Sequence, residues 1–428
     1  MKSCIECGRL YPADSGFCPV DGRELVNVSQ APAAASEQDA RVGSIVCGRY
    51  EVRRIVADGG MGRVFEAIDL QTKRNVALKI LHAEVASDSV AVERFRREFD
   101  VSKLLSHEHV VEVLDFQSTG DGTFALAMEF LYGEELRSAL KREGTLPPSR
   151  IVRMLAQLAV GLDGAHDKKL VHRDLKPDNI FLCQTREGDN VKILDFGSVK
   201  DKADNAKKLT VIGTTIGSPY YMAPEQAQGL ETLDHRADVW ALAAIAYECV
   251  TGSVPFSGIN GPSILLEILT KTPVAPSLRN PSPKYPVPPT LDRVMTQAFQ
   301  KNPVMRIASV GQLADKFGEA YGLEGNHLEW LALTQAEVEA RIEAQLPAMM
   351  TAALQVVPGG DALDDFFGAG GSVLNVETSP MKRAGEPARD VPLDLSTVPA
   401  AMPKWVIPAV VAGVLLLVVG ALLLLITL

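Results

Sequence analysis

One polar run constrains this chain more than any other stretch. It spans His172–Asn179, reads HRDLKPDN, and lies between the apolar segments 170–171 and 180–182. A carboxylate base, a cation and an amide that can bind a metal thus lie within one short loop. Phosphoryl transfer needs these groups together, because it requires a proton acceptor, a positive charge near the moving phosphoryl group and ligands for Mg²⁺. Further phosphate-binding groups must then lie elsewhere in the chain.

Such groups occur on both sides of this run and in a fixed order. Residues 57–64 read ADGGMGRV, and glycines let a backbone close over phosphates and aim its N–H groups at them. Lys79 stands alone in the apolar segment 76–80, VALKI, where a buried cation is costly unless it is paired. The tripeptide Asp195–Gly197 follows the short predicted strand 191–194, and Ala223–Glu225 reads APE.

These motifs, in this order, resemble those of the eukaryotic-type serine/threonine protein kinases, in the membrane-anchored form found in bacteria. The resemblance covers residues 50–321, which is enough chain for two lobes with cores of their own. It implies an α+β, two-lobed protein kinase fold that transfers the γ-phosphoryl group of ATP to serine or threonine hydroxyls of protein substrates. Residues 172–179 would be the catalytic loop, Asp238 would brace it, and Arg306 would pair with Glu225 of the APE tripeptide.

The resemblance gives a role to each charged residue of the catalytic loop and its neighbour. Asp174 would accept or orient the proton of the substrate hydroxyl, and Lys176 would neutralise charge on the γ-phosphoryl group. A lysine at this place is typical of serine/threonine kinases rather than tyrosine kinases. Asn179 and Asp195 would hold Mg²⁺ through oxygen ligands.

The resemblance also predicts the nucleotide site. Lys79 would hold the α- and β-phosphates and pair with Glu98 of the helical segment 92–101, in preference to the neighbouring Glu93. The other residues that we expect to contact ATP are Val56, Ala57, Gly59, Gly60, Gly62, Val64, Ala77, Glu129, Leu131 and Phe181. The backbone of 129–131, in the hinge between the lobes, would face the edge of the adenine, and Val64, Ala77 and Phe181 would enclose its ring.

Two alternatives share the fold. Ala57 replaces the first glycine of the phosphate loop, which is the one feature that favours a membrane-tethered pseudokinase that binds nucleotide without transfer. The intact Lys79, Asp174 and Asp195 favour an active enzyme. A small-molecule kinase of the aminoglycoside type shares part of the catalytic loop, but the APE tripeptide favours a protein substrate.

Arg173 precedes the catalytic aspartate, and kinases with this arginine are often switched by a phosphate on the activation segment. Such a phosphate forms charge-assisted bonds to arginine. We therefore expect autophosphorylation at Thr210, Thr214 or Thr215, with a homodimer as the arrangement for transfer in trans.

The first 27 residues resemble a small zinc ribbon. Cys4, Cys7, Cys18 and Asp21 form two pairs of equal spacing, with the aspartate in place of the last cysteine. Three thiolates and one carboxylate can form a tetrahedral Zn²⁺ site, and a segment this short needs a metal to fold. The alternative is a disordered leader with scattered cysteines.

The C-terminal segment predicts a membrane anchor. Residues 405–428 carry no charged side chain, and a helix of the last 20 residues would span about 30 Å, the thickness of the hydrocarbon core. Basic residues precede it, ending at Lys404, which places the kinase domain in the cytoplasm. We expect a single-pass protein of the cell membrane that is anchored at its C-terminus.

The remaining segments read as connections. Residues 28–49 form a linker that ends at the kinase domain, and residues 322–404 are helical and then a disordered juxtamembrane linker. The helical part carries an apolar stripe over 333–350 that could pack on the large lobe or on a partner. The net charge of −10 argues against nucleic acid as a partner.

Overall fold

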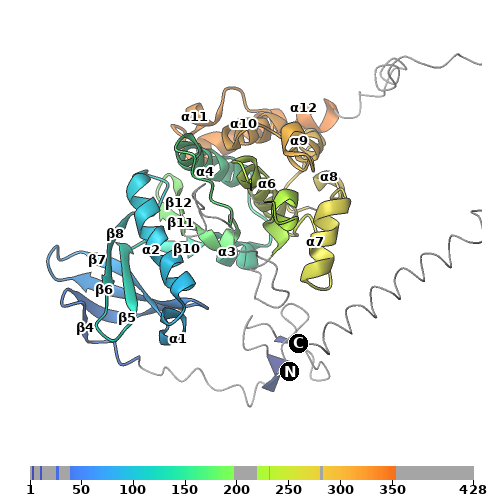
Figure 1. Ribbon diagram of the computed structural model, residues 1–428. Helices are drawn as coiled ribbons and strands as arrows, with labels where there is room; N and C mark the ends of the chain where they lie inside the picture. The colour runs from blue at the N-terminus through green and yellow to red at the C-terminus, as the bar shows by residue number, and fades with distance from the viewer. Residues whose placement is uncertain are drawn as a thin grey trace, which may run out of the picture. The chain divides into compact units, whose positions relative to one another are not determined.

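The computed structural model describes residues 39–196, 219–230, 232–279 and 283–352, and the backbone of three short strands near the N-terminus (Figure 1). These strands, β1 (Lys2–Ser3), β2 (Leu10–Tyr11) and β3 (Val26–Asn27), form a small antiparallel sheet in the order β2-β1-β3. Several predictions fall outside the described residues and stay predictions. They concern the zinc ligands Cys4, Cys7, Cys18 and Asp21, the threonines of 197–218, and the membrane segment 405–428.

A six-stranded antiparallel sheet forms the small lobe, in the order β4-β5-β6-β7-β9-β8. Its strands alternate between side chains that enter a core and side chains that leave it, as pleated strands require. Its core joins Tyr50, Val52, Phe65, Leu78 and Ile80 on one face of the sheet. The strands are β4 (Ile45–Val46), β5 (Tyr50–Asp58), β6 (Gly62–Asp69), β7 (Asn75–Leu81), β8 (Val113–Ser118) and β9 (Phe124–Glu129).

Helix α2 (Ser89–Leu104) packs on the other face of this sheet, after the short helix α1 (Ala83–Ala86). Figure 1 shows α2 beside the small-lobe sheet. Asp88 caps its N-terminus by accepting a hydrogen bond from the backbone N–H of Val90, which satisfies an N–H that the helix itself leaves unpaired. Phe95 is buried against Leu126, so this apolar face fixes the position of Glu98 on the same helix.

The large lobe begins with a three-stranded antiparallel sheet and continues as helices. The strands are β10 (Gly133–Glu135), β11 (Ile180–Thr185) and β12 (Gly188–Ile193), in the order β10-β11-β12. The helices are α3 (Leu136–Glu143), α4 (Pro148–Asp167), α5 (Pro224–Ala227), α6 (Arg236–Thr251), α7 (Gly261–Thr270), α8 (Pro276–Arg279), α9 (Thr290–Ala298) and α10 (Val310–Ala320). Single 3₁₀ turns lie at Pro177–Asn179, Pro219–Tyr221 and Pro303–Met305.

Helix α6 is the centre of the large-lobe core. It is apolar on nearly all sides and buried along almost its whole length, as expected of a helix without a polar stripe. The ring of Trp240 stacks on Phe256 with centroids 5.5 Å apart and meets Phe299 edge to face at 5.1 Å. This rigid core carries Asp238 on the first turn of the helix.

Two helices, α11 (His327–Trp330) and α12 (Gln335–Ala352), follow the residue predicted to end the kinase domain, and both pack on the large lobe. Trp330, Val338 and Ile342 are buried in its core. The apolar stripe predicted for this region therefore covers the lobe rather than a partner, except that Met350 at its end is exposed.

No helix within the described ranges is both long and apolar enough to cross a membrane. The segment predicted to do so, 405–428, lies beyond residue 352, where those ranges end.

Candidate active site

Lys79 joins the two lobes at the predicted nucleotide site. Its Nζ lies 2.9 Å from Oε2 of Glu98 on α2 and 3.6 Å from Oδ2 of Asp195, which follows β12. The predicted pairing with Glu98 is therefore present, whereas Glu93 lies exposed on the same helix. Lys79 lies on a central strand, and both of its negatively charged partners lie on other elements. These two carboxylates offset the cost of burying the lysine.

The charges of this triad shift one another. Burial alone would lower the pKa of Lys79, but the carboxylates of Asp195 and Glu98 outweigh it and hold that pKa above its ordinary value. Burial has the opposite effect on the carboxyl group and raises the pKa of Glu98. The charge of Lys79 counteracts this shift, and the charge of Asp195 adds to it. Lys79 is therefore held in its charged form, whereas burial favours the neutral form of Glu98.

The catalytic loop gathers its functional groups around Asp174. Lys176 Nζ donates to Asp174 Oδ2 at 2.8 Å, and Asn179 Nδ2 donates to the backbone oxygen of Asp174 at 2.7 Å. The 3₁₀ turn Pro177–Asn179 brings the amide of Asn179 back over the loop. Because its nitrogen faces Asp174, Oδ1 is the atom of Asn179 that can act as a metal ligand.

Asp238 on α6 braces the backbone of the catalytic loop, as the sequence predicts. Its Oδ2 accepts the backbone N–H of His172 at 2.8 Å and its Oδ1 accepts that of Arg173 at 2.9 Å. The carboxylate is fully buried, and Nε2 of His166 on α4 lies 2.8 Å from the same Oδ2. Burial tends to raise the pKa of Asp238, but His166 and the loop N–H groups hold it below its ordinary value.

Two residues of the site have left-handed backbone conformations. Arg173 has φ of 69° and Asp195 has φ of 52°, values that side chains other than glycine adopt at a cost of about 1–3 kcal/mol. The hydrogen bond to Asp238 holds Arg173 in this conformation. Such strain is typical of functional positions, where the surrounding structure fixes a side chain in one direction.

The glycine-rich loop is the turn between β5 and β6. A Cβ at Gly62 would lie 2.3 Å from the carbonyl oxygen of Ile80, so the close approach of β6 and β7 requires a glycine there. Gly59 and Gly60 lie at the turn, where an added Cβ meets nothing closer than 3.6 Å. Ala57 pairs with Val64 within the β5–β6 ladder, directly after a register shift between Ile55 and Ala57, and it has no positive φ, so its backbone does not require a glycine.

Apolar residues predicted to enclose the adenine lie on one face of the small-lobe sheet. Val64 pairs with Lys79 across β6 and β7, and Ala77 pairs with Met128 across β7 and β9, so all four side chains share a face. The other predicted contacts, Val56, Leu131 and Phe181, are exposed or half-buried on β5, after β9 and on β11. Half-buried apolar side chains on this face provide a surface that a flat ring could cover.

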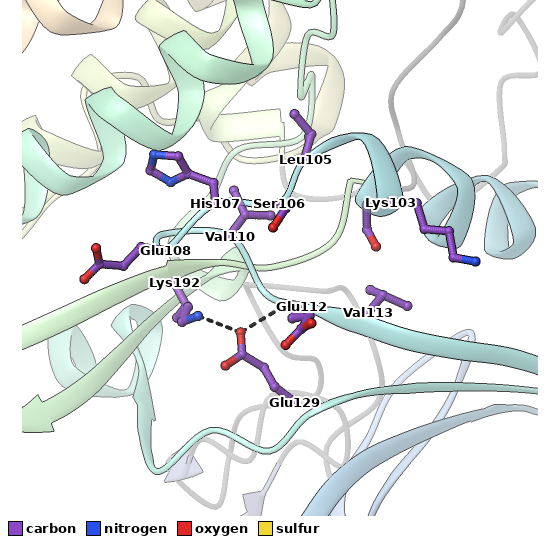
Figure 2. A pocket seen from close by; sticks show the side chains of 11 residues that line it. Lys103, Leu105, Ser106, His107, Glu108, Val110, Glu112, Val113, Glu129 and Lys192 are labelled. Carbon is purple, nitrogen blue, oxygen red and sulfur yellow. Dashed lines mark hydrogen bonds and ion pairs between the residues drawn. The ribbon is translucent and has the colours of Figure 1, made fainter.

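The backbone and the side chain of Glu129 have different roles. Its backbone belongs to the hinge, but its Oε1 accepts hydrogen bonds from Lys192 Nζ at 2.6 Å and from the backbone N–H of Glu112 at 2.9 Å (Figure 2). These contacts border a polar cavity of about 470 Å³. Figure 2 shows Lys103, His107 and Glu129 around it. Of the predicted site residues, Glu129 lines this cavity, whereas Lys79, Asp174 and Asp195 do not.

The APE glutamate pairs with a distant arginine, as the sequence predicts. Arg306 donates from both terminal nitrogens to the two carboxylate oxygens of Glu225, at 2.8 and 2.9 Å, and both side chains are buried. This bidentate pair fixes the end of the activation segment on the large lobe.

The donor set fits Mg²⁺. Asn179 and Asp195 offer an amide and a carboxylate oxygen, and Mg²⁺ commonly takes only one or two such protein ligands together with water and phosphate oxygens. Consistent with this sparse set, no cluster of three or more His, Cys, Asp or Glu side chains suited to a metal occurs within the described ranges.

Some contributors to the site carry no sequence signal. His166 contacts Asp238 across 72 residues of sequence, and His82 contacts the carbonyl oxygen of Gly59 across 23 residues. Both histidines stand singly in their segments, so no motif identifies them. Only knowledge of which segments lie side by side could have done so.

A fold of two lobes with these groups between them defines a class of protein, and the comparison with known families agrees. The family model for the protein kinase domain matches residues 50–317, more than half of the 428 residues. The chain belongs to the protein kinase family.

Its relatives include named serine/threonine-protein kinases. The chain is 39% identical to pkn3 of Myxococcus xanthus over 276 residues, which is 64% of this chain and 50% of that protein. It is 38% identical to PknA of Mycobacterium tuberculosis over 281 residues, which is 64% of this chain and 62% of that protein. The match thus spans about half to three fifths of these relatives.

Solved structures give the same result for the fold. A double mutant of the PknI kinase domain from Mycobacterium tuberculosis matches with a TM-score of 0.51 and 27% identity, covering 65% of this chain and 97% of that one.

Proposed function

We propose that this chain is a serine/threonine protein kinase that transfers the γ-phosphoryl group of ATP to hydroxyls of protein substrates. The observation that carries this proposal is the position of Lys79, 2.9 Å from Glu98 of one lobe and 3.6 Å from Asp195 of the other. This ion-pair arrangement is what a protein kinase requires for transfer, since it places the phosphate-binding lysine beside the metal-binding aspartate.

Asp174 is proposed as the base that accepts or orients the proton of the substrate hydroxyl. Lys176, 2.8 Å from its carboxylate, is proposed to neutralise charge on the transferred group. The hydrogen bonds from the backbone of His172 and Arg173 to Asp238 keep these groups in place before substrate arrives. Rate enhancement then comes from positioning and electrostatics rather than from a covalent intermediate.

Lys79 and the glycine-rich loop are proposed to bind the phosphates, and the half-buried face with Val64 and Ala77 the adenine. Asn179 and Asp195 are proposed to hold Mg²⁺, which would supply positive charge to neutralise the phosphate groups. These assignments rest on the oxygen donor set and on the shared face of β6 and β7.

A serine or threonine acceptor is supported by Lys176 and by the names of the relatives. The pseudokinase alternative rests on Ala57 alone, and Ala57 still pairs with Val64 in the β5–β6 ladder without a positive φ.

We further propose three features that concern residues outside the described ranges. Autophosphorylation at Thr210, Thr214 or Thr215, in trans within a homodimer, would supply a phosphate for Arg173 to bind. Residues 405–428 would anchor the protein in the cell membrane as a single span, with the kinase domain in the cytoplasm. Cys4, Cys7, Cys18 and Asp21 would bind Zn²⁺.

The test is incubation of the full-length chain with γ-labelled ATP, Mg²⁺ and a serine- and threonine-rich protein substrate, followed by phosphoamino acid analysis. We expect label on phosphoserine or phosphothreonine and none on phosphotyrosine. If ATP binds but neither the substrate nor the chain itself becomes labelled, the kinase activity is rejected and the pseudokinase alternative is favoured. Phosphopeptide mapping of the same sample tests the three threonines.

A further inference from the structure

Asp58 begins the glycine-rich turn and lies between two cationic or donor groups. Its Oδ2 accepts a hydrogen bond from Nε of Arg63 at 2.8 Å, and its Oδ1 lies 3.1 Å from Nε2 of His82. Arg63 is on the strand that leaves the turn, and His82 follows the end of β7. The aspartate therefore ties the two sides of the turn to the neighbouring strand.

His82 also contacts the backbone of the turn at two places. Its Nε2 lies 2.9 Å from the carbonyl oxygen of Gly59, and its own backbone N–H donates to the carbonyl oxygen of Met61 at 3.1 Å. Because both neighbours of Nε2 are oxygen acceptors, the ring hydrogen resides on this nitrogen. His82 thus holds the turn at Gly59 and Met61, on either side of Gly60, which has no atom within 4 Å of the place of its missing Cβ.

The same contacts continue to the segment that precedes the kinase domain. Nη1 of Arg63 donates a hydrogen bond to Oδ2 of Asp39 at 2.7 Å, and the side chain of Asp39 is mostly buried. Arg41, two residues later, donates to Asp121 in the loop between β8 and β9 at 2.9 Å. The stretch that connects the N-terminal 38 residues to the kinase domain is therefore fixed on the small lobe at two points.

We propose that His82 and Asp58 are positioning residues for the glycine-rich loop and that Arg63 couples them to Asp39. The polar chain Asp39–Arg63–Asp58–His82 holds the loop in the conformation that binds nucleotide phosphates, and it links that conformation to the N-terminal segment. This inference rests on the proposed function, because the loop is assigned to ATP there.

The physical reason is preorganisation. The C=O and N–H of a trans peptide point in opposite directions, so anchoring the carbonyl oxygen of Gly59 at His82 directs the N–H of Gly60 away from it. A glycine turn without such an anchor loses more conformational entropy when it closes over a ligand. The anchor therefore favours nucleotide binding by reducing this entropy loss.

The test is direct titration of the full-length chain with ATP and Mg²⁺, which does not depend on turnover. We expect His82→Leu to weaken ATP binding about three- to tenfold, the effect of one hydrogen bond, and to change kcat less than KM for ATP. His82→Gln, which keeps a donor, restores most of the affinity. Glu84→Gln, an exposed acidic side chain two residues away, is the matched control.

Asp39→Asn is expected to weaken ATP binding in the same direction. The double variant with His82→Leu should lose less than the sum of the two single losses, because both act through one chain of contacts. Thermal unfolding of each variant shows whether the fold is intact.

Unchanged ATP affinity in His82→Leu, or an equal loss in His82→Gln, overturns the role of His82. Additive losses, or no loss in Asp39→Asn, overturn the coupling to Asp39. The proposed function is decided separately in the same samples, by comparing turnover of the wild type and of Asp174→Asn. An active wild type with an insensitive His82 rejects only this inference.

Discussion

The side chains of His166 and Asp238 meet in the core of the large lobe, with Nε2 2.8 Å from Oδ2. The same oxygen accepts the backbone N–H of His172, so a histidine on α4 stabilises the carboxylate that positions the catalytic loop. Asp163 lies 3.7 Å from the other ring nitrogen of His166. The loop is thus connected through one buried carboxylate to two helices of the large lobe.

This contact predicts how stability depends on pH. Burial lowers the pKa of His166, but Asp163 and Asp238 outweigh it and raise that pKa from 6.5 to about 9. Because the folded pKa lies above the unfolded one, the stabilisation is fully present below pH 6.5 and is lost as the pH rises through 9. The free energy of unfolding should fall by up to about 3 kcal/mol over this range.

Urea denaturation of the wild type and of His166→Gln at pH 6 and pH 9.5 measures this effect. The variant cannot titrate at this position, so its unfolding free energy should depend less on pH. Equal pH dependence in both proteins would show that His166 contributes nothing.

Glu98→Gln is expected to lower kcat/KM on the order of 100-fold, because the amide removes the charge that holds Lys79 in place. Glu93→Gln makes the same chemical change on an exposed face of the same helix and should leave kcat/KM near that of the wild type. Steady-state kinetics over a range of ATP concentrations, at one saturating concentration of protein substrate, gives kcat/KM for ATP in both variants. Similar losses in both variants would assign the effect to helix α2 in general.

Glu225→Gln should destabilise the fold by about 3–5 kcal/mol, because it leaves the buried guanidinium of Arg306 without its counter-charge. The comparison is Glu267→Gln, which breaks the more exposed pair with Lys271 and should cost below about 1 kcal/mol. Urea denaturation of both variants gives the two values. A loss of stability below about 1 kcal/mol for Glu225→Gln would contradict this expectation. It would mean that the structure around Arg306 relaxes or admits water to the guanidinium group.

Gly62→Ala and Gly60→Ala separate two reasons for glycine in the phosphate loop. The first substitution places a Cβ 2.3 Å from the Ile80 carbonyl oxygen, so it should destabilise the small lobe by about 1–3 kcal/mol. The second meets no atom within 4 Å, so its unfolding free energy should match that of the wild type. Calorimetry of both variants checks this order, and the reverse order would contradict the close approach of β6 and β7.

The sequence predicted those parts of the site that are local or belong to spaced motifs. Asp174, Lys176 and Asn179 lie in one loop, so their proximity follows from the chain itself. The pairing of Lys79 with Glu98 follows from a resemblance to known kinases and is present in the structure. The same holds for the brace at Asp238 and for the pair of Glu225 with Arg306.

The contacts that the sequence did not predict are made by single residues far apart in the chain. His82 reaches Gly59 only because β7 ends beside the turn that begins β6, a matter of strand register. The side chain of Glu129 turns to Lys192 while only its backbone belongs to the hinge. The sequence does not predict which surface α12 covers, because an apolar stripe fits a lobe or a partner equally well. In the structure it packs on the large lobe.

The most direct test of the account is the rate of γ-phosphoryl transfer to a protein substrate by the wild type and by Asp174→Asn, measured beside their affinities for ATP. Asparagine keeps the shape of the side chain but cannot accept the hydroxyl proton. We predict that the variant binds ATP as the wild type does and transfers at least about 100-fold more slowly. Equal transfer rates in the two proteins would contradict the role of Asp174, and ATP binding without transfer in both would contradict the assignment as an active kinase.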